Sequence, residues 1–256
     1  LVMAWIQAGF FSKTLGMSVQ CNVILPVREE ENKAAKRPVL WLLHGARGNC
    51  DDWIRYTSIE RYATARGLAV VMPSAHMSSY MNMAHGGRFY DYIAKELPRR
   101  MRVYFPLSDK RKENFIAGLS MGGRGALMIG LANPRKYARV GCLSAGFDIP
   151  DNASYRDAVI DAGELLPAYA DTRNNARNIL ESRMPRPVIY HAVGSNDDSF
   201  LPAAREVRAF FTDMAGNPFR YVYEESPGGH DWAFWDKAIE RFISLLPLKD
   251  DGAAWR

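Results

Sequence analysis

The chain has 256 residues, of which 48% are hydrophobic, 12% aromatic and 24% charged. These fractions are typical of a globular protein and exclude disordered, collagen-like and disulfide-scaffold classes. Lysine and arginine number 33 against 28 aspartate and glutamate residues, giving a formal net charge of +5. The basic residues are scattered and no nucleic-acid-binding module accompanies them, so we expect no nucleic-acid partner.

The chain has three cysteines, Cys21, Cys50 and Cys142. They form neither a disulfide framework nor a metal-binding spacing, so we predict no structural metal and no cofactor. No run approaches the roughly 18 apolar residues of a membrane helix, so no membrane partner is expected. The apolar first ten residues lack the charged start and the cleavage site of an export signal. The compartment is left open between the cytoplasm, which is slightly favoured, and secretion after removal of a leader, and the oligomeric state is also left open.

Short β-rich runs alternate with longer helical stretches along the chain. The predicted strands are Val19–Leu25, Val39–Leu43, Leu68–Met72, Phe115–Leu119, Val140–Ser144, Val188–Val193 and Phe219–Tyr223. Most are continuous apolar runs, which are typical of strands buried on both faces. The first alternates between apolar and polar residues, and we predict that it pairs with the second in an antiparallel edge hairpin closed by residues 27–38.

Helical patterns lie between these strands. They cover Asp51–Arg66, Phe89–Tyr104, Met121–Leu131, Pro202–Ala215 and Asp231–Leu246. The alternation predicts one α/β domain over residues 1–256, with a mostly parallel, doubly wound sheet of about eight strands. Residues 146–186 contain no good strand and many polar residues. They are either an insertion or lid over the sheet, or a long crossover with one or two helices.

The segment Gly118-Leu-Ser-Met-Gly-Gly123 directly follows an apolar strand and opens an alanine- and glycine-rich helix. This GxSxG pattern is typical of a nucleophile elbow with Ser120 at the turn. A strand that reverses tightly into a helix leaves no room for side chains two residues before and two after the serine. The helix N-terminus that follows favours developing negative charge. We therefore predict Ser120 as the nucleophile; the alternative is a tight turn with an incidental serine.

A serine nucleophile needs a base and an acid that orients it, and in such a fold the acid and then the histidine follow the serine along the chain. His191 lies inside a strand and is interpreted as a buried sheet histidine, whereas His230 lies in a glycine-rich loop before the last helix and is the predicted base. The loop after the preceding strand offers Asp197 and Asp198. We predict Asp197 as the acid, and Asp198, which could instead cap the next helix, is the alternative.

Two backbone N–H groups should face the developing oxyanion, each contributing roughly 10²–10³ in rate. One is expected from Met121, directly after the serine. The other is expected from Ala46, in the loop after the second predicted strand, where Gly45 lets the backbone approach. His44 is expected to hold this loop by hydrogen bonding. Arg47 is interpreted as facing solvent rather than anchoring an anionic substrate group.

The pair His44-Gly45, the elbow at residues 118–123 and the segment Gly229-His-Asp-Trp232 together resemble the esterase D family of α/β-hydrolases. Within that family the likeness is greatest to bacterial tributyrin esterases and cinnamoyl or feruloyl esterases, and it extends over residues 10–246. The resemblance implies an α/β-hydrolase fold and assigns the three catalytic roles to the same serine, aspartate and histidine. The family also contains S-formylglutathione hydrolases and mycolyl-type acyltransferases, so the likeness does not determine the reaction in detail.

By the same resemblance, the methionine-rich segment 76–85 lines the acyl or alcohol pocket. Within it Tyr80, Met81 and Met83 are predicted to contact substrate, together with Trp232 beside the predicted base. Ordinary loop packing is the alternative for the residues of the methionine-rich segment.

We predict a metal-independent serine carboxylesterase that acts on small-molecule esters, either short-chain acyl or phenolic (cinnamoyl or feruloyl) esters, through an acyl-enzyme. The alternatives are a thioesterase of the S-formylglutathione hydrolase kind, an acyltransferase on the same triad, and a non-catalytic binding module. The binding module is disfavoured because no triad member is missing.

Overall fold

The computed structural model describes the chain except for residues 1, 28–35, 150–158, 160–165 and 249–256. In the described part, eight strands form one sheet in the order β1-β2-β4-β3-β5-β6-β7-β8. The strands are β1 (Val2–Ser12), β2 (Met17–Val27), β3 (Val39–Leu43), β4 (Ala69–Pro73), β5 (Asn114–Leu119), β6 (Arg139–Leu143), β7 (Val188–Gly194) and β8 (Val222–Ser226). From β4 to β8 all neighbours are parallel, whereas β2 is antiparallel to both β1 and β4. The predicted fold class is therefore confirmed.

The hairpin is made of different strands from those predicted. Strand β1, which is absent from the predicted strands, pairs along its whole length with β2. Strand β3 lies between β4 and β5 and is parallel to both, so it has no free edge for β2 and the predicted pairing of the first two strands is wrong. The alternation of β1 is hidden in the sequence because Trp5 and Phe11, which are exposed, are as apolar as Ile6 and Phe10, which pack on the core.

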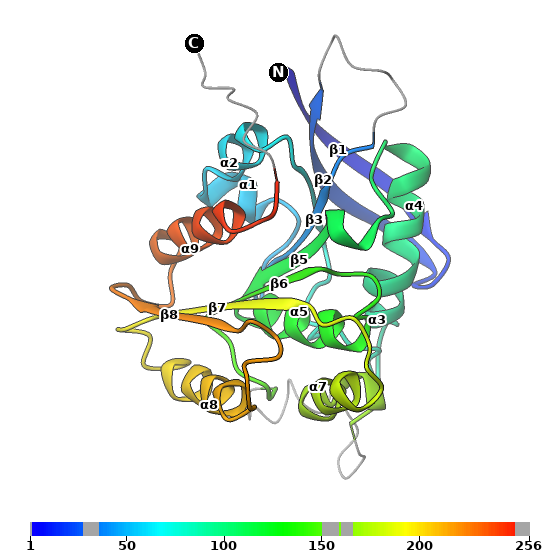
Figure 1. Ribbon diagram of the computed structural model, residues 1–256. Helices are drawn as coiled ribbons and strands as arrows, with labels where there is room; N and C mark the ends of the chain where they lie inside the picture. The colour runs from blue at the N-terminus through cyan, green and yellow to red at the C-terminus, as the bar shows by residue number, and fades with distance from the viewer. Residues whose placement is uncertain (1, 28–35, 150–158, 160–165, 249–256) are drawn as a thin grey trace.

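Helices cover both faces of the sheet (Figure 1). One face carries α1 (Asp52–Tyr56), α2 (Ile59–Ala65) and α9 (Trp232–Ser244). The other carries α5 (Met121–Ala132), α7 (Thr172–Glu181) and α8 (Leu201–Thr212), with α3 (Phe89–Asp91) and α4 (Leu97–Tyr104) beside them. Each face has its own buried apolar cluster, around Trp53 and Phe242 on the first and around Leu127 and Phe211 on the second. Burial on both faces explains why the central strands are continuously apolar.

Two predicted helices differ in detail. Residues 51–66 form two helices because Thr57 is extended, with φ −136° and ψ 169°, and its hydroxyl accepts the N–H of Ile59. Residues 89–104 form a continuous helical segment with a π-helical turn, η1 (Tyr92–Glu96), just before Pro98. Proline has no N–H to donate, so it is accommodated where a new helical turn begins.

The last predicted strand is shifted by three residues, and β8 starts at Val222. Phe219, which was expected to begin that strand, is instead buried against Phe211. A short 3₁₀ turn, η2 (Arg111–Glu113), precedes β5.

The described residues of the segment 146–186 contain η3 (Ala168–Ala170) and α7, and no strand lies among them. Helix α7 packs against α5, and Asp171 caps its N-terminus by accepting the N–H of Asn174. Residues 150–158 and 160–165 of the predicted insertion or lid lie outside the described residues.

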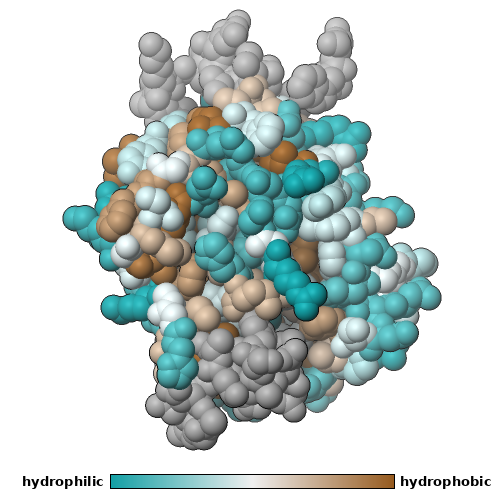
Figure 2. Space-filling model, turned by 180° about the vertical axis from the view of Figure 1, so that it is seen from behind, coloured by the Kyte–Doolittle hydropathy of each residue, from teal (hydrophilic) through white to brown (hydrophobic). Residues whose placement is uncertain are grey.

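The molecular surface mixes polar and apolar residues. On the face shown in Figure 2, polar residues predominate on the right and apolar ones gather toward the left. Exposed large apolar side chains on the hairpin and α4 are Trp5, Phe11, Met17, Val103 and Tyr104. Within the described residues, no helix is long and apolar enough to cross a bilayer.

Candidate active site

Ser120 lies on a sharp turn between β5 and α5. Its backbone has φ 52° and ψ −121°, a conformation that costs energy for any residue with a Cβ. A Cβ on Gly118 would lie 2.4 Å from the carbonyl oxygen of Gly122, and one on Gly122 would lie 2.5 Å from that of His44. The turn therefore requires glycine at both positions, as the sequence predicts.

Side chains from three separate loops meet at the carboxyl edge of the sheet. His230 Nε2 lies 3.0 Å from Ser120 Oγ, and His230 Nδ1 lies 2.8 Å from Asp197 Oδ2. The Asp197 side chain is fully buried, whereas that of His230 is 29% exposed. An ionised carboxylate only accepts hydrogen bonds, so Nδ1–H donates to Asp197 and Nε2 accepts from the Ser120 hydroxyl. In this arrangement the imidazole can take the serine proton.

The imidazole of His230 is held by rings as well as by hydrogen bonds. Phe200 stacks on it at a centroid distance of 4.6 Å and an angle of 13°, and Trp235 meets it edge-on at 4.9 Å. The second oxygen of Asp197 accepts the N–H of Phe200, which fixes the carboxylate as well. Asp198 is exposed. Of the two candidate acids, Asp197 is the one that contacts the histidine.

Ala46 and Met121 lie on the wall of the same cavity as Ser120. Met121 is the first residue of α5, and the first amides of a helix have no carbonyl partner within it. Arg47 is exposed, and its N–H donates to Met77 Sδ at 3.0 Å. Both residues expected to supply the oxyanion N–H groups therefore line the cavity of Ser120.

Two other histidines are buried and hold neighbouring loops in place by hydrogen bonds. Burial lowers the pKa of His44 to about 4, so the ring is neutral; it accepts the N–H of Ala75 and donates to the carbonyl of Gly45. Burial likewise lowers the pKa of His191 to about 4, and its ring bridges the Tyr221 hydroxyl and the carbonyl of Ala145. The first ring holds the loop of Ala46, as the sequence predicts, and the second holds the end of β6.

The cavity beside Ser120 has a volume of about 210 Å³. It is lined by Ala46, Ser79, Ser120, Met121, Arg124, Ala145, Gly146, Asp148 and Phe200. Among the described residues, no group of three or more His, Cys, Asp or Glu side chains is placed to hold a metal ion.

The four predicted substrate contacts are not on this wall. Tyr80 and Met81 are fully buried behind it, and the Tyr80 hydroxyl donates to the carbonyl of His44. Met83 lies against Gly86, and Trp232 stacks on Tyr56 at a centroid distance of 5.0 Å. Tyr80 and Met81 are directed into the core, and within the segment 76–85 their neighbour Ser79 lines the cavity.

Comparison with known proteins identifies the family. A family model described as "Putative esterase" matches residues 12–243. The chain belongs to this esterase family. It is 31% identical to an acetyl esterase of Caldicellulosiruptor saccharolyticus over 270 residues, covering 97% of this chain and 100% of the relative.

Solved structures agree with that assignment. FphF, a fluorophosphonate-binding serine hydrolase of Staphylococcus aureus, is 32% identical with a TM-score of 0.87, over 95% of this chain and 98% of that one. The S-formylglutathione hydrolase FrmB of Staphylococcus aureus is 33% identical with a TM-score of 0.84, over 96% of this chain and 99% of that one. The esterase is a serine carboxylic ester hydrolase with the α/β-hydrolase fold.

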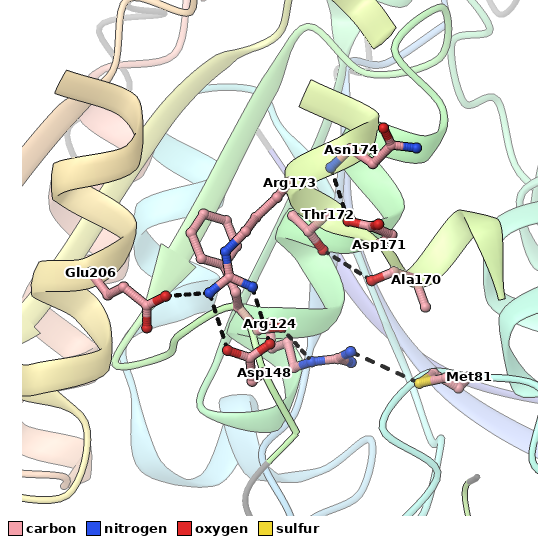
Figure 3. Close-up of polar contacts among 10 residues, drawn as sticks. Met81, Arg124, Asp148, Ala170, Asp171, Thr172, Arg173, Asn174 and Glu206 are labelled. Carbon is pink, nitrogen blue, oxygen red and sulfur yellow. Dashed lines mark hydrogen bonds and ion pairs between the residues drawn. The ribbon is translucent and has the colours of Figure 1, made fainter. Parts of the chain in front are cut away.

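One wall of the esterase cavity is held by an ion-pair network (Figure 3). Arg173, on α7, contacts both carboxylate oxygens of Asp148 at 3.2 Å and also pairs with Glu206 on α8. Its guanidinium lies 4.3 Å from the ring centroid of Phe147. The network therefore joins α7, α8 and the loop after β6, which contributes Asp148 to the cavity.

Arg124 is a wall residue that sequence reasoning missed. It is buried, and its Nε donates to the carbonyl of Phe147 at 3.0 Å, while Met81 Sδ lies 3.9 Å from a terminal nitrogen (Figure 3). The available signal was a single charge in an otherwise apolar helix, four residues after Ser120. That spacing places both side chains on the same helix face.

Proposed function

We propose that the esterase uses Ser120 as nucleophile, His230 as general base and Asp197 as the acid that orients His230. The observation that carries this proposal is the unbroken hydrogen-bonded chain Asp197–His230–Ser120 at a cavity. The two long-range contacts bring together residues 33 and 110 positions apart in the chain.

The reaction follows from these positions. His230 removes the proton as Ser120 Oγ bonds to the ester carbonyl carbon, and the carbonyl oxygen becomes an oxyanion facing the N–H groups of Ala46 and Met121. Collapse of this intermediate breaks the bond to the alcohol oxygen, which takes the proton from His230. Water then attacks the acyl-enzyme by the same steps, releasing the acid and restoring the serine hydroxyl.

Short acyl groups are the proposed substrates. The cavity of about 210 Å³ is smaller than the roughly 300–1,000 Å³ of sites for drug-sized ligands. The similar acetyl esterase supports the same acyl size. We expect acetyl and butyryl esters to be hydrolysed faster than feruloyl esters, whose acyl group carries an aromatic ring.

Residues 146–186 are proposed as a cap within the single domain. Their described part places α7 against α5 and holds Asp148 at the cavity through Arg173. Tyr80 and Met81 do not contact substrate in this proposal. Tyr80 supports the oxyanion loop, and Met81 supports Arg124.

S-Formylglutathione is a second candidate substrate. The likeness to FrmB supports it, and the formyl group is the smallest acyl group the cavity would hold. The same three side chains would serve, because a thioester carbonyl is attacked in the same way.

Labelling with a fluorophosphonate followed by peptide mapping tests the nucleophile. The expected result is modification at Ser120 alone; modification of another residue would refute the assignment. Initial rates on p-nitrophenyl acetate, p-nitrophenyl butyrate, methyl ferulate and S-formylglutathione then rank the substrates. A highest kcat/KM on methyl ferulate would overturn the short-acyl proposal.

A further inference from the structure

A second cavity, of about 390 Å³, opens at the opposite edge of the parallel sheet from Ser120. It lies where β6 and β7 begin, and these strands run from right to left in Figure 1. Strand β6 alone has five residues, and at about 3.3 Å per residue it separates this cavity from the catalytic one by roughly 16 Å. The catalytic apparatus uses none of its residues.

The walls of this cavity carry five basic side chains, and no acidic residue is among its lining. The basic residues are Arg111, Lys112, Arg139, Arg186 and Arg220. In the described structure, Lys112, Arg139, Arg186 and Arg220 make no hydrogen bond or ion pair through their side chains to an acid. Like charges gathered without acids repel one another, and a bound anion would remove that repulsion.

The geometry holds several of these cations in place. Arg139 begins β6 and lies in register between Phe115 and Val188, so its backbone is fixed by both neighbouring strands. Burial, and then the charge of Arg220, lower the pKa of Arg139. The fold thus keeps two cations close enough to disfavour each other's charge.

The remaining cations are positioned by backbone contacts. Arg111 donates from Nε to the carbonyl of Pro134 at 2.7 Å and from Nη2 to that of Arg186 at 2.9 Å. Arg220 has a left-handed backbone with φ 46°, and its N–H donates to the carbonyl of Asn217. A non-glycine residue is held in that conformation at an energetic cost.

Apolar groups complete the site. Phe219 is buried at its base, and Pro187, Pro218 and Pro247 form part of its walls. Apolar walls lower the local dielectric and strengthen the attraction between the cations and an anion. Arginine binds phosphate oxygens in a bidentate manner.

We propose that this amino-edge cavity is a binding site for a small, multiply charged phosphate compound, such as a nucleoside diphosphate. Its volume admits such a molecule, with the phosphates on the arginines and the organic part against the prolines. The cavity is open to solvent, so a soluble molecule of this size can reach its cations.

Isothermal titration with inorganic pyrophosphate and with ADP, at fixed ionic strength, tests the proposal. The expected result is saturable 1:1 binding of both, which raises the melting temperature of the protein. The double variant R139Q/R220Q should bind pyrophosphate at least about tenfold more weakly. Esterase activity on p-nitrophenyl acetate should be unchanged, because these residues are remote from Ser120.

The matched control removes two positive charges elsewhere. R99Q/K237Q changes exposed residues on α4 and α9 that line neither cavity and should leave the affinity within twofold. Equal losses in both double variants, or no saturable binding to the wild-type protein, would overturn the proposal. Binding of vesicles containing phosphatidylglycerol without binding of pyrophosphate or ADP would overturn it as well. If R139Q/R220Q does not fold, K112Q/R186Q, at two exposed residues, provides the same test.

Discussion

The two edges of the parallel sheet carry sites of opposite kinds. At the carboxyl edge, Ser120, His230 and Asp197 are each held at hydrogen-bonding distance, and the chemistry depends on the positions of single atoms. At the amino edge, five basic side chains surround a cavity, and binding there would depend on their summed charge. Substitutions should therefore have steep effects at the first edge and graded effects at the second.

Backbone strain is distributed unequally between the two edges. Nine non-glycine residues of the described chain have positive φ. Those on loops that follow the carboxyl ends of strands are Arg47, His76, Ser79, Tyr80, Ser120 and Ser144. Such conformations persist where the surrounding structure enforces them, and they are concentrated around the site that needs the greatest positional accuracy.

Replacing the nucleophile should have the largest effect. Ser120→Ala removes one oxygen and should lower kcat on p-nitrophenyl acetate by about 10⁶, since the acyl-enzyme cannot form and only binding and the oxyanion donors remain. The melting temperature should change little, because the new side chain keeps the Cβ of the elbow. Activity above about 1% of the wild-type value would contradict the assignment of Ser120.

Replacing the buried acid comes next. Asp197→Asn should lower kcat by about 10⁴, because an amide donor facing Nδ1 favours the wrong imidazole tautomer. Asp198→Asn is the matched control: its carboxylate is exposed and does not contact His230, so kcat should stay within twofold. A larger loss in Asp198→Asn than in Asp197→Asn would reverse the assignment of the acid.

The buried histidines at the carboxyl edge should make stability depend on pH. Their folded pKa of about 4 lies below the ordinary value of 6.5, so the unfolded chain binds more protons between these values. Their contribution is complete above pH 6.5 and is lost as the pH falls toward 4. At pH 4.5 the loss is roughly 2–3 kcal/mol for each of His44 and His191, at about 1.4 kcal/mol per pH unit.

The Glu96 carboxylate contributes to this pH dependence mainly in more acidic solution. Burial raises the pKa of Glu96, but hydrogen bonds from residues 12–14 outweigh it and lower the pKa to about 2, so its stabilisation is lost below about pH 4.5. Denaturant unfolding at pH 7 and pH 4.5 measures the histidine effect. His191→Gln should reduce the difference by roughly 2–3 kcal/mol. His76→Gln, at an exposed position, should change it much less, because the charge of His76 is only a minor cause of the lowered pKa of His44. An unchanged difference in His191→Gln would contradict the prediction.

The fold was predictable where local sterics or burial decide it, and less so where pairing is long-range. The continuous apolar runs of β3 and β5 mark strands buried on both faces whatever their neighbours. The partner of β2 depends instead on which strand leaves an edge free, and a local pattern does not contain that information. The single helix predicted over residues 51–66 was wrong in a smaller way. One side-chain hydrogen bond of Thr57 divides an otherwise continuous helical pattern.

In the candidate site, too, features set by local sterics were predictable and those set by long-range contacts were not. Gly118 and Gly122 could be interpreted from sequence because the elbow has no room for a Cβ at either. The direction of Tyr80 could not, because it depends on a hydroxyl that reaches the carbonyl of His44 across the fold. The network of Arg173 with Asp148 and Glu206 joins three elements far apart in sequence, and nothing in the local pattern of any one of them indicates it.

Loosening the wall of the catalytic cavity should have a moderate effect. Arg173→Gln removes the ion pairs that hold Asp148, and these are partly exposed, so kcat/KM for p-nitrophenyl acetate should fall only about two- to fivefold. The ratio of butyrate to acetate hydrolysis should rise, because a less firmly held wall leaves more room for the longer acyl group. Arg177→Gln, on the same helix but outside this network, is the control. An unchanged acyl preference would show that Arg173 does not shape the pocket.

Removing one charge at the amino edge should have the smallest effect. The direction of the change in melting temperature distinguishes this edge from the catalytic one. Arg220→Gln relieves the repulsion with Arg139, so without added anion the melting temperature should rise by about 1 °C, as expected for a surface substitution of a few tenths of a kcal/mol. In saturating pyrophosphate the order should invert, because the wild-type protein gains more from the ligand. Differential scanning fluorimetry with and without pyrophosphate measures both. A lower melting temperature for Arg220→Gln in both conditions would mean that Arg220 serves stability rather than anion binding.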